Sequence, residues 1–200
     1  MFQVGITGGI GVGKTTVCKV FELFGVPVYY SDEAAKIVIE TQDVKTKIVE
    51  AFGSDVLASD ATLDKKKLAA IVFNDKAKLT VLNSIVHPAV DSHFKQWISA
   101  QTNAKYIIKE AAILFESGAS LAMDKVITVT APLELKIQRA MLRDKSTREQ
   151  IEERINNQMS DDEKINRSDF VIYNDDQQLV IPQVIQTHEA ILKLAARIVG

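Results

Sequence analysis

An eight-residue stretch from Gly8 to Thr15 constrains this chain more than any other part of its sequence. Its spacing, G-x-x-x-x-G-K-T, is that of a phosphate-binding P-loop, in which glycines let backbone N–H groups turn inward around phosphate oxygens. Lys14 adds a positive charge at the outer phosphates, and the Thr15 hydroxyl is placed to bind Mg²⁺. The motif therefore predicts a nucleotide site that uses Mg²⁺.

The residues on either side of the motif favour a true P-loop over a chance glycine-rich turn. Phe2–Thr7 has the composition of a short buried strand, and Thr15–Phe24 has the pattern of a helix that ends at Gly25. Strand, loop and helix is the order that the motif requires, and the helix directs its positive N-terminal end at the phosphates. We expect nucleotide contacts from Gly9, Ile10, Gly11, Val12, Gly13, Lys14, Thr15 and Thr16.

Composition limits the remaining possibilities. The chain has 200 residues, 46% of them hydrophobic, which is enough for one sizeable α/β domain. A net charge of −2 argues against general nucleic-acid binding. The single cysteine, Cys18, excludes an internal disulfide and a cysteine-based metal cluster, and we expect its side chain to be buried. Without an export signal or an apolar run of about 18 residues, we expect a cytoplasmic protein that binds no membrane.

Asp32 is the first candidate for chemistry beyond the P-loop. It follows Val26–Tyr30, a predicted strand, and ligands of parallel sheets bind beyond the carboxyl ends of the strands. Asp32 is therefore a candidate general base that activates an attacking hydroxyl. The alternative is a structural role in the first turn of a helix that Ser31 caps.

The stretch 32–102 is almost wholly helical in pattern, and no strand pattern interrupts it. We expect one helix to begin at Asn74 or Asp75, and a further helix to carry Pro88 in its first turn. A helical block inserted between strands is suited to binding a substrate.

Two side chains of this block are candidate substrate ligands. Lys66 lies in the basic run Lys65–Lys67, which binds an anionic substrate or simply faces solvent. His87 precedes Pro88 at a predicted helix junction, where a lone histidine more often has a structural role.

A second acidic candidate follows the apolar run Tyr106–Ile108, which predicts a central strand. Glu110 lies where P-loop enzymes often hold an acid near the metal, usually through water. The motif is incomplete because Lys109 interrupts it, so Glu110 is a candidate for the metal or the substrate. Glu116 is expected in a loop, and Val126–Thr130 predicts a further strand.

Two arginine-bearing helices follow. The first opens at Ala131-Pro132 and carries Arg139 and Arg143, which lie four residues apart and share one face. The second begins at Ser146–Glu149, which has the pattern of a capping box, and carries Arg154 and Gln158 four residues apart.

The pair predicts a lid over residues 137–165 that closes on phosphates. An arginine fork binds phosphate oxygens in a bidentate way, and closure excludes water. The alternative is a solvated hairpin with ordinary ion pairs. Phe170–Tyr173 then predicts the last strand, and Asn174 in the following loop is well placed for adenine. The final helix is expected to reach Ile198 with a buried stripe of Val184, Ile185, Ile191, Leu192 and Ala195.

The order of these features resembles that of the dephospho-coenzyme A kinase family over nearly all of the chain. Apart from the P-loop each motif is weak, but their order and spacing together are specific. The motifs are Gly5–Thr15, Gly25–Val28 leading to Ser31-Asp32, Phe52-Gly53, His87-Pro88, Ile113–Glu116, Arg139-x-x-x-Arg143-Asp144, Arg154-x-x-x-Gln158 and Asp169–Asn174.

The resemblance implies transfer of the γ-phosphoryl group of ATP to the ribose 3′-hydroxyl of 3′-dephospho-coenzyme A, the last step of coenzyme A biosynthesis. It implies an α/β fold of the P-loop, adenylate-kinase-like type, a parallel sheet with helices on both faces. The core would be residues 1–31, 103–136 and 166–200, with a coenzyme A-binding insertion at 32–102 and the lid at 137–165. We expect small-molecule partners alone, ATP and 3′-dephospho-coenzyme A, and a monomer or weak homo-oligomer.

By position, Asp32 resembles the base of the family, and Arg139 and Arg143 resemble its lid arginines. The expected substrate ligands are Asp32, Lys66, His87, Glu110 and Arg154, and the expected catalytic groups are Asp32, Lys14, Arg139 and Arg143. Two positions depart from the family pattern. Tyr30 stands where an acid is usual, and a tyrosine supplies no carboxylate at neutral pH for a metal or a hydrogen bond. Ala112 replaces a proline, which loosens the turn there.

Two rival hypotheses use the same P-loop. The first is a kinase for another small molecule, such as a nucleotide, a nucleoside or a sugar acid, because the fold does not fix the acceptor. The second is a nucleotide-dependent switch, for which Asn166–Asp169 is the closest match to a guanine-reading N-K-x-D motif. It lacks the lysine and precedes a strand, which disfavours the switch.

Overall fold

The computed structural model describes residues 1–72 and 75–198. It separates into two compact units, Met1–Tyr30 with Gln101–Gly200, and Ser31–Ala100. We call them the sheet unit and the helical unit. The helical unit covers nearly the same residues as the insertion expected from the sequence.

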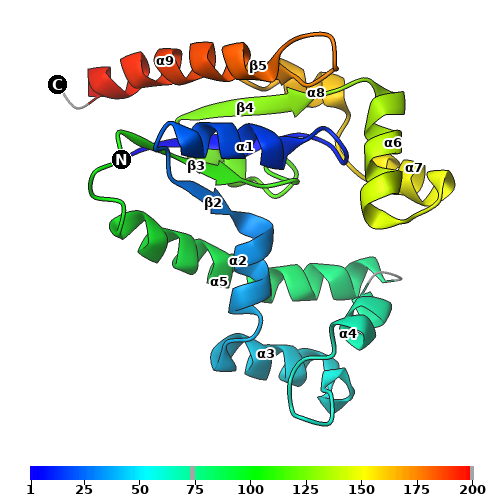
Figure 1. The fold of residues 1–200 in the computed structure, drawn as a ribbon. Coiled ribbons are helices and arrows are strands. Elements are labelled where there is room, and N and C mark those ends of the chain that lie inside the picture. Colours follow the sequence, from blue (N-terminus) through cyan, green and yellow to red (C-terminus); the bar gives the residue numbers. More distant parts are fainter. Residues whose placement is uncertain (73–74, 199–200) are drawn as a thin grey trace. The chain divides into compact units, whose positions relative to one another are not determined.

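The sheet unit is built on five parallel strands in the order β2-β3-β1-β4-β5 (Figure 1). The chain enters at the middle strand, so the loop after β1 lies at the centre of the edge where all five carboxyl ends meet. The strands are β1 (Phe2–Thr7), β2 (Val28–Tyr30), β3 (Tyr106–Glu110), β4 (Lys125–Thr130) and β5 (Phe170–Tyr173). The parallel sheet confirms the predicted α/β class, and β3 is an interior strand as expected.

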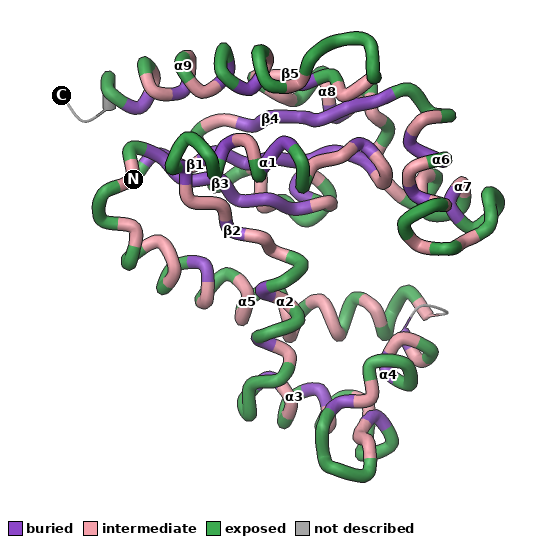
Figure 2. The backbone as a smooth tube through the Cα atoms, in the orientation of Figure 1, coloured by how far each residue is buried: buried purple, intermediate pink, exposed green. Residues whose placement is uncertain are grey.

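The three interior strands, β3, β1 and β4, are almost wholly buried (Figure 2). Alternate residues of each strand point to opposite faces of the sheet. Val4 and Ile6 of β1 pack with α1 (Lys14–Leu23) and α9 (Val180–Ile198) on one face. Gly5 points to the other face, where a Cβ would lie 2.5 Å from Leu114 Cδ2. That face carries the segment 111–123, which includes the short helix η2 (Ala119–Ala122), and α8 (Asp161–Asn166). Helices on both faces confirm the predicted architecture.

Two further helices, α6 (Leu133–Asp144) and α7 (Arg148–Asn156), follow β4 in the chain and precede α8. The two helices pack on one another. Their shared core is Ile137, Ala140 and Ile151. This hairpin corresponds to the arginine-bearing pair predicted from the sequence, and we call α6 and α7 the lid hairpin after that prediction.

The helical unit has its own core beneath α5 (Lys76–Ser99). The other elements are α2 (Ser31–Val38), α3 (Gln42–Phe52), η1 (Ser54–Val56) and α4 (Lys65–Val72). The core consists of Val44, Ile48, Val56, Leu63, Leu68 and Val72.

The expectation of a new helix at Pro88 is wrong, because α5 continues through that residue. A proline inside a helix removes one hydrogen bond and costs about 3 kcal/mol. Helices α2, α3 and α4 all pack on α5, and this tertiary packing maintains the helix across the proline. At its start, the Asp75 side chain accepts from the N–H groups of Ala77 and Lys78, whereas the alternative cap, Asn74, lies outside the described residues.

Three local predictions differ from the structure in detail. Ser31 is the first residue of α2 and not the residue before it. The capping box of α7 joins Thr147 to Gln150, because the helix begins one residue later than the Ser146–Glu149 pattern indicates. Ile185 was expected in the buried stripe of α9 but is 39% exposed. Over the described ranges 1–72 and 75–198, every helix is too short or too polar to cross a membrane.

Candidate active site

The P-loop joins the carboxyl end of β1 to the first turn of α1, and two of its glycines are required by their surroundings. Gly11 and Gly13 have φ angles of 77° and 86°, in the left-handed region. A Cβ at Gly11 would lie 2.1 Å from the carbonyl oxygen of Lys136, and one at Gly13 would lie 2.3 Å from Asn174 Nδ2. The loop is therefore enclosed by α6 on one side and by the segment after β5 on the other.

The Lys14 side chain folds back over this loop. Its Nζ donates to the carbonyl oxygen of Gly8 at 2.8 Å and lies 3.9 Å from Glu110 Oε1. Glu110 is the last residue of β3 and pairs in register with Ile6 of β1, which brings its carboxylate to the loop. The structure thus brings two of the predicted site residues, Lys14 and Glu110, together.

Thr15 and Thr16 occupy the first turn of α1, and both are exposed. Their hydroxyls stand beside the N-terminal end of the helix, where backbone N–H groups favour anions. The described part of the chain contains no group of three or more histidine, cysteine, aspartate or glutamate side chains that could hold a metal ion.

Asn174 fastens the second half of the P-loop. Its Nδ2 donates to the carbonyl oxygen of Val12 at 2.8 Å, although the sequence suggested an adenine contact. Its own carbonyl oxygen accepts from Arg139 Nη1 at 2.9 Å, and Arg139 Nη2 lies 2.6 Å from Asp176 Oδ1. The arginine of α6 that lies nearer the loop is therefore already attached to it through Asn174.

Arg143 lies one turn further along α6 and binds a different carboxylate. Its Nε and Nη2 donate to the two oxygens of Asp144 at 2.7 and 3.1 Å, and Arg154 Nη1 donates to the same group at 2.7 Å. The hydrogen bonds from Arg143 and then from Arg154 hold the pKa of the Asp144 carboxyl far below its ordinary value. Arg139 and Arg143 share a helix face, as expected, but their guanidinium groups have separate partners.

Three predicted site residues belong to the helical unit and are exposed within it. Asp32 lies in the first turn of α2. Lys66 lies at the start of α4, where its backbone N–H donates to Asp64 Oδ1 at 3.0 Å. His87 lies inside α5, which continues through Pro88, and not at the junction between two helices that the sequence predicted.

The two departures from the family pattern lie in the sheet unit. Burial, together with the neighbouring Cys18 and Glu22, raises the pKa of the Tyr30 phenol, so Tyr30 supplies no negative charge at neutral pH. The carbonyl oxygen of Ala112 accepts from Thr7 Oγ1 at 3.3 Å, which ties the turn to the end of β1. Cys18 is buried as expected, and burial raises the pKa of its thiol, so it is unreactive.

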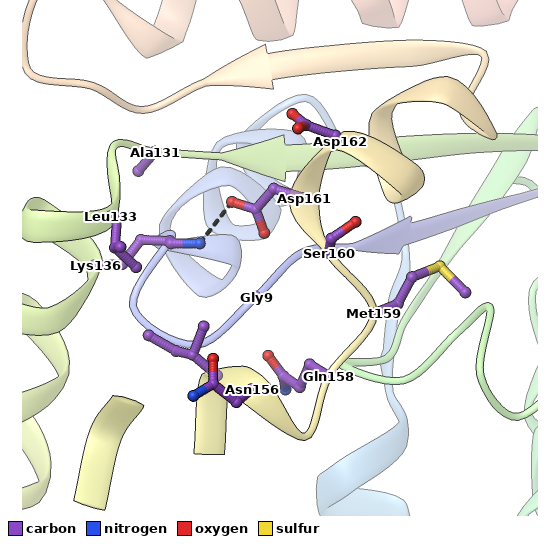
Figure 3. A pocket seen from close by; sticks show the side chains of 11 residues that line it. Gly9, Ala131, Leu133, Lys136, Asn156, Gln158, Met159, Ser160, Asp161 and Asp162 are labelled. Atoms are coloured by element: carbon purple, nitrogen blue, oxygen red, sulfur yellow. Dashed lines mark hydrogen bonds and ion pairs between the residues drawn. The ribbon is translucent and has the colours of Figure 1, made fainter. Parts of the chain in front are cut away.

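A buried ion pair that the sequence did not indicate stands over the start of the P-loop (Figure 3). Lys136 of α6 is 5% exposed, and its Nζ lies 2.6 Å from Asp161 Oδ2, which also accepts from Thr130 Oγ1 at 3.2 Å. The pair lines a pocket of 440 Å³ that includes Gly9 and Gln158. A lysine on a helix, among charged neighbours such as Glu134 and Arg139, usually faces solvent, so the sequence pattern gave no sign that Lys136 is buried.

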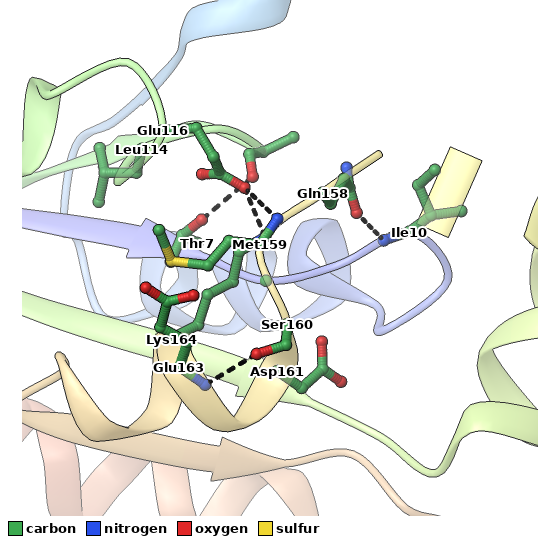
Figure 4. Close-up of polar contacts among 12 residues, drawn as sticks. Thr7, Ile10, Leu114, Glu116, Gln158, Met159, Ser160, Asp161, Glu163 and Lys164 are labelled. Atoms are coloured by element: carbon green, nitrogen blue, oxygen red, sulfur yellow. Dashed lines mark hydrogen bonds and ion pairs between the residues drawn. The ribbon is translucent and has the colours of Figure 1, made fainter. Parts of the chain in front are cut away.

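A second network joins the end of the lid hairpin to the P-loop (Figure 4). The backbone N–H of Ile10 donates to Gln158 Oε1 at 3.2 Å. In the next residue, the N–H of Met159 donates to Glu116 Oε1 at 3.0 Å, and the fully buried Lys164 places its Nζ 3.1 Å from the same oxygen. Glu116 lies in a loop as expected, but it anchors the segment that carries Gln158.

Comparison with known proteins agrees with this geometry. The family model described as Dephospho-CoA kinase matches residues 2–179. A dephospho-CoA kinase of Bacteroides fragilis is 43% identical over 185 residues, which cover 92% of this chain and 90% of that protein. One of Fusobacterium nucleatum is 40% identical over 171 residues, which cover 86% of this chain and 88% of that protein.

Two solved structures are similar to this chain over nearly its whole length. The dephospho-CoA kinase of Campylobacter jejuni has a TM-score of 0.70 at 26% identity, covering 96% of this chain and 97% of that one. A crystal structure of a protein from Thermus thermophilus has a TM-score of 0.84 at 30% identity, and 96% of each chain is covered.

Proposed function

The chain belongs to the dephospho-CoA kinase family, and from that premise we propose how its residues phosphorylate 3′-dephospho-coenzyme A with ATP. The enzyme is a kinase that catalyses the last step of coenzyme A biosynthesis. The roles of individual residues, the metal and the lid are the proposal. The observation that carries it is the position of Lys14, folded over the P-loop between the Gly8 carbonyl and the Glu110 carboxylate.

The P-loop and Lys14 hold the β- and γ-phosphates of ATP. Loop N–H groups and the N-terminal end of α1 receive the phosphate oxygens, and Thr16 adds a hydroxyl in the same turn. Phosphate oxygens replace the Gly8 carbonyl as the partner of Lys14 Nζ, because an ammonium group binds an anionic oxygen more strongly than a neutral carbonyl oxygen. Phosphoryl transfer depends mainly on alignment and electrostatics, so this placement is the main contribution of the loop.

The residues beside the loop fit Mg²⁺. Thr15 offers an exposed hydroxyl and Glu110 a carboxylate at the same sheet edge, and hard oxygen donors suit this ion. Mg²⁺ binds protein through few ligands when phosphates and water supply the others, which agrees with the small donor set. Bound there, Mg²⁺ would neutralise charge on the transferred phosphoryl group.

Asp32 accepts the proton of the ribose 3′-hydroxyl and orients it for attack. The family resemblance supports this role, as does its place two residues beyond the carboxyl end of β2. Lys66 and His87 of the helical unit offer a cation and a polar ring to the phosphates and pantetheine of the acceptor, and Arg154 and Glu110 complete the substrate ligands.

Arg139 and Arg143 stabilise charge on the transferred group when the lid hairpin closes. Both are bound to carboxylates, Asp176 and Asp144, and a triphosphate, which carries more negative charge, competes for a guanidinium fork more strongly than a single carboxylate. Asn174 follows β5 and bonds to both Arg139 and Val12, which supports the proposal that it contacts the nucleotide. We propose a cytoplasmic enzyme that acts as a monomer or weak homo-oligomer and binds small molecules and not nucleic acid.

The proposal is tested by ADP release from ATP and Mg²⁺ in the presence and absence of 3′-dephospho-coenzyme A. We expect release that depends on this acceptor, together with a product whose mass matches coenzyme A. Release that ignores this acceptor and follows a nucleotide, a nucleoside or gluconate would support the rival small-molecule kinase. Stable nucleotide occupancy without turnover would support the switch.

A further inference from the structure

The upstream half of the P-loop is held by Gln158, a side chain to which the motif Arg154-x-x-x-Gln158 gives no role. Ile10 donates its backbone N–H to Gln158 Oε1 at 3.2 Å, and a Cβ on Gly9 would lie 3.6 Å from the same oxygen. Gln158 follows α7 closely, so it reaches the loop from the end of the lid hairpin (Figure 4). The downstream half is held from the opposite side by Asn174 on the Val12 carbonyl.

The hydrogen bond between Ile10 and Gln158 limits the conformations of the glycine-rich P-loop. Gly8, Gly9, Gly11 and Gly13 give the loop many accessible conformations, and fixing them for a phosphate costs conformational entropy. An acceptor already bound to Ile10 fixes part of the loop before the nucleotide arrives, so less entropy is lost on binding.

The segment that carries Gln158 is itself anchored. Glu116 accepts from the N–H of Met159, the next residue, and faces the Nζ of Lys164. Lys164 is fully buried, and its carbonyl oxygen accepts from Thr128 Oγ1 of β4 at 3.3 Å and from Ser168 Oγ at 2.7 Å. The anchor therefore extends from the lid hairpin, through the ion pair of Glu116 with the buried Lys164, to the sheet.

We propose that Gln158 is a positioning residue of the P-loop, which sets the conformation of Gly9 and Ile10 for the phosphates of ATP, and that Glu116 and Lys164 hold it in place. The inference rests on the proposed function, because it takes ATP as the ligand of this loop. A glutamine suits the role because it offers an acceptor to the N–H without adding negative charge beside a triphosphate.

Two substitutions of Gln158 separate the need for a hydrogen-bond acceptor from the need for a neutral side chain. Gln158→Leu removes the acceptor at similar volume, and Gln158→Glu keeps an acceptor but adds a negative charge. Gln150→Leu is the matched control, because Gln150 accepts from the Thr147 N–H at 3.0 Å within the cap of α7, on the same hairpin. For all three variants we would measure steady-state kinetics with each substrate varied in turn. We would also measure the melting temperature and the binding of ATP in the absence of 3′-dephospho-coenzyme A.

Gln158→Leu is expected to raise KM for ATP about fivefold, which corresponds to one hydrogen bond of about 1 kcal/mol, with KM for 3′-dephospho-coenzyme A unchanged. Gln158→Glu is expected to keep the wild-type melting temperature and still weaken ATP binding, more so at low ionic strength. Gln150→Leu is expected to lower only the melting temperature.

An unchanged KM for ATP in Gln158→Leu, or wild-type ATP affinity in Gln158→Glu at low salt, would overturn the proposal. A fall in melting temperature with no selective effect on ATP would also overturn it, since a merely structural bond gives that result. Failure of the proposed function is distinguishable, because it appears in the wild type as ADP release that ignores the acceptor, or as no ATP binding.

Discussion

Lys14 Nζ donates to the carbonyl oxygen of Gly8 at 2.8 Å, so the lysine spans the loop whose ligand it is proposed to hold. The same Nζ lies 3.9 Å from Glu110 Oε1, and its side chain is only 12% exposed. The lysine is therefore positioned over the loop by contacts within the sheet unit.

Replacing this ammonium group is expected to impair phosphoryl transfer more than folding. Lys14→Met keeps the aliphatic stem but removes the charge, and we expect kcat/KM for ATP to fall about 100-fold or more, as for other preorganised electrostatic groups. Steady-state ADP release measures the loss. Lys19→Met, on an exposed lysine of the same helix, is the control and should retain near wild-type turnover. Equal effects of the two substitutions would contradict the role of Lys14.

Asp32 and Glu33 are adjacent, exposed acids in the first turn of α2, which makes them a matched pair. If Asp32 accepts the proton of the ribose hydroxyl, Asp32→Asn should lower kcat by about 100- to 10,000-fold, the usual contribution of general-base catalysis. Glu33→Gln removes the same charge one residue away and should leave kcat within about twofold. Rapid-quench measurement of coenzyme A formation checks both. Full phosphoryl transfer by folded Asp32→Asn would show that Asp32 is not the base.

Arg143 is 63% exposed and binds Asp144, a carboxylate that Arg154 also holds. Arg143→Ala should therefore change the free energy of unfolding by less than about 1 kcal/mol, because the Arg143 guanidinium is exposed and Arg154 remains bound to Asp144. Turnover should fall by roughly 10- to 1,000-fold if Arg143 reaches the transferred phosphoryl group on lid closure. Arg148→Ala is the control, since Arg148 is an arginine of the same hairpin that binds Glu134 and Glu152. The same turnover in both variants would remove Arg143 from the mechanism.

Local sequence patterns predicted most of the sheet unit, because its main elements are short apolar runs and one motif with fixed spacing. The strands, the P-loop and the lid hairpin lie where the pattern places them, within a few residues. Pro88 misled the prediction because a local rule ends a helix there, whereas packing from three other helices maintains α5.

The contacts around the P-loop were less accessible to sequence reasoning. Gln158 and Ile10 are 148 positions apart, and only the folded sheet brings them together. Lys136 and Lys164 are nearly or wholly buried, although lysine is one of the residues least often found inside. Their burial depends on the carboxylates of Asp161 and Glu116, and no spacing along the chain relates these partners.

The pair of Glu116 and Lys164 leads to a prediction about stability and pH. Burial raises the pKa of the Glu116 carboxyl, but hydrogen bonds from backbone N–H groups and the charge of Lys164 outweigh burial and leave the pKa below its ordinary value. A carboxyl whose pKa is lowered by folding stabilises the native state above its unfolded pKa, roughly 4.3, and this stabilisation is lost as pH falls through the lower folded pKa.

Glu116→Gln should therefore destabilise the protein at pH 7, where the buried ammonium of Lys164 would face a neutral partner. We expect a loss of about 2 kcal/mol, less than for a fully buried pair because Glu116 stays partly exposed. Urea unfolding at a series of pH values should show the difference from wild type shrinking as pH falls below the unfolded pKa of roughly 4.3, because the unfolded state takes up the proton before the folded state does. Adding Lys164→Met to Glu116→Gln should recover stability, because it removes the uncompensated charge.

Glu50→Gln, on an exposed glutamate of the helical unit, controls for charge removal. A difference between Glu116→Gln and wild type that is the same at pH 7 and pH 3 would show that the ion pair does not stabilise the fold.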